Sequence, residues 1–74
     1  MKSYEYDLTG LMCPIPIIKA HRKINELTIG DILIVITTDP IARYDFVDYC
    51  HSTKHNLLKI DNFLTHMKVH IEKK

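Results

Sequence analysis

Residues 7–16 contain the side chain most suited to react chemically, because a cysteine stands there one residue before a proline. Proline is tolerated in the first turn of a helix, where its missing N–H would have no intrahelical partner. We therefore expect Pro14 at the first helical position, Cys13 as the N-cap and Pro16 still in the first turn. A thiol there faces the positive end of the helix dipole, which favours the nucleophilic thiolate. The sequence predicts a lowered pKa for Cys13.

Other catalytic arrangements are missing from the sequence. It shows no Ser/His/Asp constellation, no paired carboxylates at a recognisable cleft, no pocket expected in so small a domain, and no glycine-rich phosphate loop. A single activated thiolate suits group transfer, in which partner proteins supply the remaining chemistry. Two alternatives stay open: Cys13 is a structural capping residue, or it serves a redox-sensing or regulatory interaction module and takes no part in group transfer.

The second cysteine and the histidines have simpler interpretations. Cys50 falls near the end of a later helix, so we expect it about a helix length from Cys13, beyond the ~7 Å that a disulfide tolerates. It is predicted to be a small buried apolar residue. His66 and His70 would lie roughly 13 Å apart on an exposed strand face, and His51 and His55 straddle a helix end. We expect solvent-facing histidines, no metal site and no cofactor.

Length and charge limit the possible classes of protein. Seventy-four residues allow one domain, residues 1–74, and an apolar fraction of 46% is normal for a globular fold. Ten Lys and Arg against nine Asp and Glu leave a formal charge of +1, which is too weak to attract nucleic acid. The sequence has neither a leader-like apolar segment nor an apolar run of membrane-spanning length. We expect a cytoplasmic monomer that neither enters a membrane nor binds nucleic acid directly.

The first half of the chain predicts a strand, a helix and a second strand. Tyr4, Tyr6 and Leu8 alternate with polar residues, which is typical of a half-buried strand. The helix that follows buries an apolar stripe at helical spacing. That stripe comprises Ile17, Ala20, Ile24 and Leu27. Residues 32–36 are continuously apolar and mostly β-branched, which indicates a central strand.

The second half repeats the strand, cap, proline and helix pattern, with Asp39 as N-cap and Pro40 after it. The second helix is expected to bury one face and to turn the other to solvent. The buried face is Ala42, Phe46, Tyr49 and Cys50, and the solvent face Arg43, Asp45 and Asp48. Residues 56–60 predict a third strand, and Asp61-Asn62 a two-residue turn. From Phe63 onward the side chains alternate between two faces, which predicts a last strand. Its side chains facing the helices would be Phe63, Thr65, Met67, Val69 and Ile71.

The order βαβαββ predicts a two-layer α/β sandwich, because parallel strands joined through helices place both helices on one side of a sheet. We expect a mixed four-stranded sheet in the order 1-2-4-3, with its other face open to solvent. Both helices would run in the same direction.

The pattern Asp-x-x-Gly-x-x-Cys-Pro-x-Pro, from Asp7 through Gly10 and Cys13 to Pro16, resembles the signature of the TusA/SirA/YedF family of small sulfur carriers. The resemblance implies that Cys13 holds sulfane sulfur as a persulfide, with Asp7, Gly10, Pro14 and Pro16 as motif support. It implies a sulfurtransferase-type carrier more than a stand-alone enzyme. The implied partners are a cysteine desulfurase or rhodanese-like donor and an acceptor in a relay serving tRNA thiolation, cofactor sulfuration or sulfur metabolism.

A carrier thiol must enter a partner's active site, so the surface around it should be recognised. We expect the contact residues to be the exposed ones nearest in sequence, which are Leu11, Met12, Ile15, Lys19 and Arg22. Leu11 and Met12 would give an apolar anchor unless they pack under the loop, and the two basic residues a charged rim that attracts an acidic donor. Both prolines are expected to fix the direction of the thiol without adding much buried area.

Overall fold

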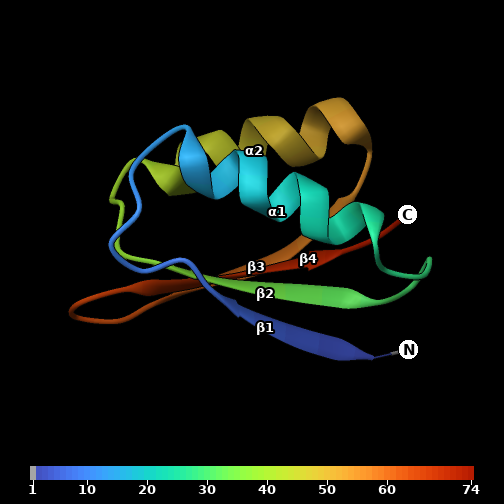
Figure 1. Ribbon diagram of the computed structural model, residues 1–74, viewed down its shortest axis with the longest axis horizontal. Helices are drawn as coiled ribbons and strands as arrows, with labels where there is room; N and C mark the ends of the chain where they lie inside the picture. The colour runs from blue at the N-terminus through green and yellow to red at the C-terminus, as the bar shows by residue number, and fades with distance from the viewer. Residues whose placement is uncertain (1) are drawn as a thin grey trace.

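In the computed structural model, which describes residues 2–74, two helices cover one face of a four-stranded sheet (Figure 1). The elements follow one another as β1 (Ser3–Asp7), α1 (Ile15–Asn25), β2 (Ile32–Thr37), α2 (Ala42–Thr53), β3 (Asn56–Asn62) and β4 (Met67–Glu72). The strands lie in the order β1-β2-β4-β3. The predicted fold class, element order and strand order are confirmed.

The strand directions decide where the ends of the helices lie. β1 pairs with β2 in parallel, whereas β4 is antiparallel to both β2 and β3. The strands β1, β2 and β3 therefore share one direction, and α1 and α2 both return against it, as predicted. Consequently the N-termini of both helices, and the loops that lead into them, meet at one end of the sheet (Figure 1). Cys13 lies in the first of these loops.

The core is a single apolar layer between the helices and the sheet. β2 and β4 each bury every second side chain beneath the helices, and α1 and α2 bury one stripe each. The buried hydrophobic residues are Leu8, Ala20, Ile24, Leu33, Val35, Ala42, Phe46, Cys50, Met67, Val69 and Ile71. The central place of β2 is confirmed, and so is most of each predicted stripe. Ile17, Leu27 and Tyr49 are only half-buried against this core, and Leu27 lies beyond the end of α1. Neither helix among residues 2–74 has the length and apolarity needed to cross a membrane.

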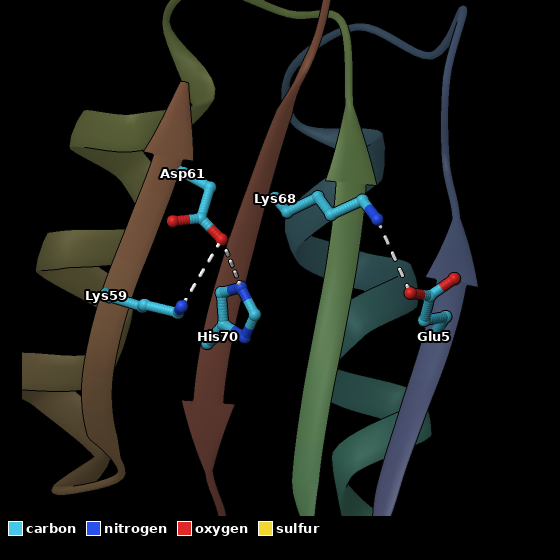
Figure 2. Close-up of polar contacts among 5 residues, drawn as sticks. All are labelled: Glu5, Lys59, Asp61, Lys68 and His70. Carbon is cyan, nitrogen blue, oxygen red and sulfur yellow. Dashed lines mark hydrogen bonds and ion pairs between the residues drawn. The ribbon is translucent and has the colours of Figure 1, made fainter. Parts of the chain in front are cut away.

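The other face of the sheet carries charged side chains in cross-strand pairs (Figure 2). Nζ of Lys68 lies 3.5 Å from Oε2 of Glu5, and Nε2 of His70 lies 3.0 Å from Oδ2 of Asp61. Lys59 reaches the same oxygen of Asp61 at 3.6 Å. The prediction that His70 faces solvent freely is wrong, since its side chain is only 15% exposed. The pairing with Asp61 holds its ring against the sheet.

The hairpin between β3 and β4 differs from the prediction. The expected turn at Asp61-Asn62 is wrong, because both residues pair with β4, opposite Lys68 and Met67. The chain turns instead within residues 63–66, where the N–H of Phe63 donates to the carbonyl of His66 at 2.8 Å. Phe63 is about half exposed there and does not face the helices as expected, nor does the exposed Thr65. The contacts of Asp61 with His70 and Lys59 favour this longer ladder.

Candidate functional site

The loop after β1 is shaped by a local hydrogen bond and a glycine. Oδ1 of Asp7 accepts the N–H of Thr9 at 2.9 Å, and this bond holds the pKa of the Asp7 carboxyl below its ordinary value. Gly10 follows with φ +83°, a conformation that residues with a Cβ rarely adopt. Leu8 is buried and fixes the start of the loop on the core. Asp7 and Gly10, the first two residues of the predicted motif, thus shape the loop that leads to Cys13.

The loop after β2 then holds the cysteine loop in place. The N–H of Gly10 donates to Oγ1 of Thr38 at 2.9 Å, and the N–H of Cys13 donates to Oδ2 of Asp39 at 2.8 Å. The second oxygen of Asp39 accepts the N–H of Ile41 at 3.0 Å. Asp39 is only 1% exposed. Sequence reasoning identified Asp39 as a helix cap but missed its bond to Cys13, for which the chain offers no local signal.

Both helices begin later than predicted. α1 starts at Ile15 with Pro14 as N-cap, so Cys13 lies one residue before the N-cap. The first bond of the helix runs from the N–H of Ile18 to the carbonyl of Pro14 at 3.2 Å, while the Cys13 amide bonds to Asp39 in the neighbouring loop. α2 starts at Ala42 with Ile41 as N-cap, although the carboxylate of Asp39 still accepts an N–H at this helix start. The expected caps are therefore wrong by one and two residues.

The electrostatic surroundings of the thiol reverse the predicted pKa shift. Cys13 is exposed and is a free cysteine. The nearby Asp45 carboxylate in the first turn of α2 raises the pKa of Cys13 above its ordinary value, and desolvation and the charge of Asp39 act in the same direction. The predicted lowering by the helix dipole is wrong, because neighbouring carboxylates disfavour a second negative charge on sulfur.

A groove between the two helices lies against the thiol. Its volume is about 350 Å³, and it is lined by Cys13, Pro14, Ile17, Asp45, Asp48, Tyr49 and Ser52. The expectations of no pocket and no paired carboxylates at a cleft are both wrong. Asp45 was also expected to face solvent, yet its Oδ2 is buried without a hydrogen-bond partner. The sequence could not show this, because the packing of α2 against α1 decides which of its polar residues face the groove.

The residues predicted to contact partners fall on two surfaces. Met12 is 62% exposed and Ile15 is exposed as well, whereas Leu11 is half-buried and packs on the core. Packing under the loop, the alternative considered for the Leu11-Met12 pair, thus holds for Leu11 alone. Lys19 and Arg22 are exposed and line a separate depression with Tyr6, Lys23 and Glu26. They do not line the groove next to Cys13.

The two prolines of the motif differ in burial. Pro14 is exposed and lines the groove, whereas Pro16 is among the fully buried side chains. The expectation that neither adds much buried area is therefore wrong for Pro16. Cys50 is 5% exposed, as predicted, and burial raises its pKa to about 11. Within residues 2–74, no three side chains of the metal-ligating types lie together.

Comparisons with known proteins identify the family. The family model described as sulfurtransferase TusA matches residues 4–73. A relative from Neisseria meningitidis serogroup A is 43% identical over 58 residues, which is 78% of either chain. The sulfur carrier protein TusA of Pseudomonas entomophila is 44% identical over 52 residues, 70% of this chain and 65% of that protein. A crystal structure of a SirA-like protein from Desulfitobacterium hafniense has the same fold, with a TM-score of 0.80, 23% identity and coverage of 97% and 96% of the two chains. This chain belongs to the TusA family.

Proposed function

We propose that the protein is a sulfur carrier that accepts sulfane sulfur as a persulfide on Cys13 and passes it to an acceptor protein. The observation that carries the proposal is the exposed thiol of Cys13 on a loop fixed by Asp39 and Thr38. A fixed, exposed thiol can react at the active site of another protein without rearranging its own loop. The names of the relatives, which include sulfur carrier protein TusA, support the same role.

The transfer needs no external oxidant. The Cys13 thiolate attacks the terminal sulfur of a persulfide on the donor, so that a new S–S bond forms while the donor's S–S bond breaks. The donor cysteine leaves as a thiolate, and the proton lost by Cys13 passes to the donor site or to water. An acceptor thiolate then attacks the terminal sulfur on Cys13 and releases the Cys13 thiolate. We propose a cysteine desulfurase or a rhodanese-like protein as the donor, and an acceptor in a relay such as tRNA thiolation.

A redox sensor, the alternative function, fits this site less well. Sensor cysteines are accessible thiolates of low pKa, since the thiolate reacts with the oxidant. Cys13 is accessible, but the Asp45 carboxylate raises its pKa. A raised pKa lowers the fraction of thiolate in the free protein, which slows its reaction with oxidants.

Sulfur loading tests the proposal. The protein would be incubated with a cysteine desulfurase and cysteine, or with thiosulfate, and its intact mass compared with that of Cys13→Ser. We expect a gain of about 32 Da that dithiothreitol removes, and no gain for the variant. Two added oxygen atoms give almost the same mass, but a sulfinic acid resists dithiothreitol. A gain that survives reduction, or that persists in Cys13→Ser, contradicts the proposal.

Partner contacts are proposed around the exposed part of the loop. Met12 and Ile15 lie beside Cys13 in sequence and expose apolar surface, and Lys19 and Arg22 follow on α1. Reversing the charge of Lys19 and Arg22 should slow transfer from a donor with an acidic surface, with a smaller effect at higher salt. Alkylation of Cys13 by a small neutral reagent should keep its rate. A transfer rate that does not change would remove these two residues from the docking surface.

A further inference from the structure

The groove between α1 and α2 has a wall of carboxylates. Asp45 and Asp48 lie three positions apart on α2, and both line it. No Lys, Arg or His is among its lining residues within the described part of the chain. None of the ion pairs formed by residues 2–74 involves Asp45 or Asp48. The groove therefore carries negative charge that the fold does not compensate.

One of these carboxylates is in an unfavourable position. Oδ2 of Asp45 is buried and accepts no hydrogen bond, although buried polar atoms nearly always have a partner. An unmet buried acceptor destabilises the folded protein, and more so when it is charged. A cation placed beside this carboxylate would offset its uncompensated charge. Asp48 is exposed at the same wall and could share the cation.

Apart from Cys13 and Ser52, the other lining residues, Pro14, Ile17 and Tyr49, are apolar or aromatic. Ile17 and Tyr49 are half-buried and pack against the core, so that each still exposes part of its side chain. The Tyr49 hydroxyl lies 2.8 Å from Nδ1 of His21 on α1, and the two rings meet edge to face at 5.6 Å. Tyr49 thus links the two helices. The groove offers a preformed apolar surface with acidic groups along one side, beside the reactive thiol.

We propose that this groove receives the cysteine-bearing segment of the sulfur-transfer partner and that this segment carries a lysine or arginine next to its cysteine. The inference rests on the proposed function, in which Cys13 reacts with sulfur on another protein. A basic side chain would lie between Asp45 and Asp48, and the apolar part of the segment would cover Ile17 and Tyr49. Charge complementarity favours this occupant over an acidic segment, which the two carboxylates would repel.

Docking and activation are coupled in this arrangement. Asp45 raises the pKa of Cys13 in the free protein. A partner cation beside Asp45 offsets that negative charge, so the thiolate becomes more accessible when the partner's sulfur is in place. The carrier would then be least reactive when alone and most reactive in its complex.

Two model peptides test the inference. Each holds one cysteine as a mixed disulfide with thionitrobenzoate, and they differ only in flanking residues, lysine in one and glutamate in the other. Cys13 loses its proton to the buffer and attacks the peptide sulfur, forming a Cys13–peptide disulfide and releasing coloured thionitrobenzoate. We expect the basic peptide to react about tenfold faster at low salt. The difference should shrink as salt screens the charges.

Matched variants locate the effect. Asp48→Lys changes the groove, whereas Glu5→Lys makes the same change of charge on the open face of the sheet (Figure 2). Asp48→Lys should abolish or invert the preference for the basic peptide, and Glu5→Lys should keep it. Equal rates for both peptides with the unaltered protein, or equal losses in the two variants, overturn the inference. The assay needs no sulfur loading, so failure of Cys13 to carry sulfur would leave the peptide preference as a separate result.

Discussion

The N–H of Cys13 donates to the carboxylate of Asp39 across 26 residues of sequence, at 2.8 Å. This bond joins the loop after β1 to the loop after β2 and holds the reactive residue just outside α1. Asp39 accepts from Ile41 with its other oxygen. One buried carboxylate therefore fixes both helix starts at the end of the sheet where the thiol is exposed.

Removing this carboxylate should loosen the thiol loop and lower stability. In Asp39→Ala the N–H groups of Cys13 and Ile41 lose their acceptors, so we expect a loss of about 1–3 kcal/mol in the free energy of unfolding. Glu26→Ala is the control, because Glu26 is exposed at the C-terminal end of α1 and its carboxylate pairs with Lys23, far along the helix from the Cys13 loop. Denaturant titration gives the stability, and hydrogen exchange at the Cys13 amide reports on the loop. Equal exchange rates at the Cys13 amide in both variants would show that Asp39 does not hold the thiol loop in place.

The reactivity of the thiol should depend on Asp45. Because its carboxylate raises the pKa of Cys13, the rate of alkylation by iodoacetamide should reach half its maximum at a pH above that of an ordinary thiol. Asp45→Asn removes the charge and should move this midpoint to lower pH. Asp48→Asn removes an equal charge from the same groove without contributing to the shift, and should leave the midpoint nearly unchanged. Identical midpoints in the unaltered protein and Asp45→Asn would refute the stated cause.

The buried cysteine should matter for stability and not for transfer. Cys50→Ser places a hydroxyl in the core, and we expect a loss of about 1–3 kcal/mol with sulfur loading retained. Burial raises the pKa of Cys50 to about 11, so above the ordinary value near 9 the unfolded chain releases a proton that the folded protein keeps. Stability should therefore fall as pH rises from about 9 to about 11. Cys50→Ala should flatten that fall, and an unchanged slope in the variant would exclude Cys50 as its source.

The two sides of the first turn of α1 should respond differently to truncation. Pro16 is fully buried, so Pro16→Ala removes packed volume and should cost roughly 1–3 kcal/mol. Ile18→Ala shortens an exposed side chain two residues further on and should change stability by less than about 1 kcal/mol. Chemical denaturation of both variants provides the comparison. A larger loss of stability for Ile18→Ala than for Pro16→Ala would contradict the burial of Pro16 and the exposure of Ile18.

Local patterns were sufficient to predict most of the fold. The apolar run of β2 indicated its central place, and the spacing of Ala20 and Ile24 gave the buried face of α1. Alternation predicted the inward side chains Val69 and Ile71 of β4. The turn before β4 was misplaced, because the contact between Asp61 and His70 across the ladder has no signature in the turn residues themselves.

The site was predictable only in part. The motif singled out Cys13, because glycine and proline restrict the backbone conformation and so mark a turn before a helix in the sequence itself. The bond from Cys13 to Asp39 and the approach of Asp45 to the thiol depend on how the two helices pack, and residues so distant in sequence give no periodic signal. This is also why the predicted shift in the pKa of Cys13 had the wrong sign.

Transfer of labelled sulfur is the most direct test of the carrier function. The protein would be loaded with a heavy sulfur isotope on Cys13, freed of donor, and mixed with an acceptor protein or peptide that has one cysteine, while both intact masses are followed. A carrier should lose one labelled sulfur atom as the acceptor gains the same atom, and Cys13→Ser should transfer none. Label that stays on the protein, or that appears only as free sulfide while the acceptor mass is unchanged, would contradict the account.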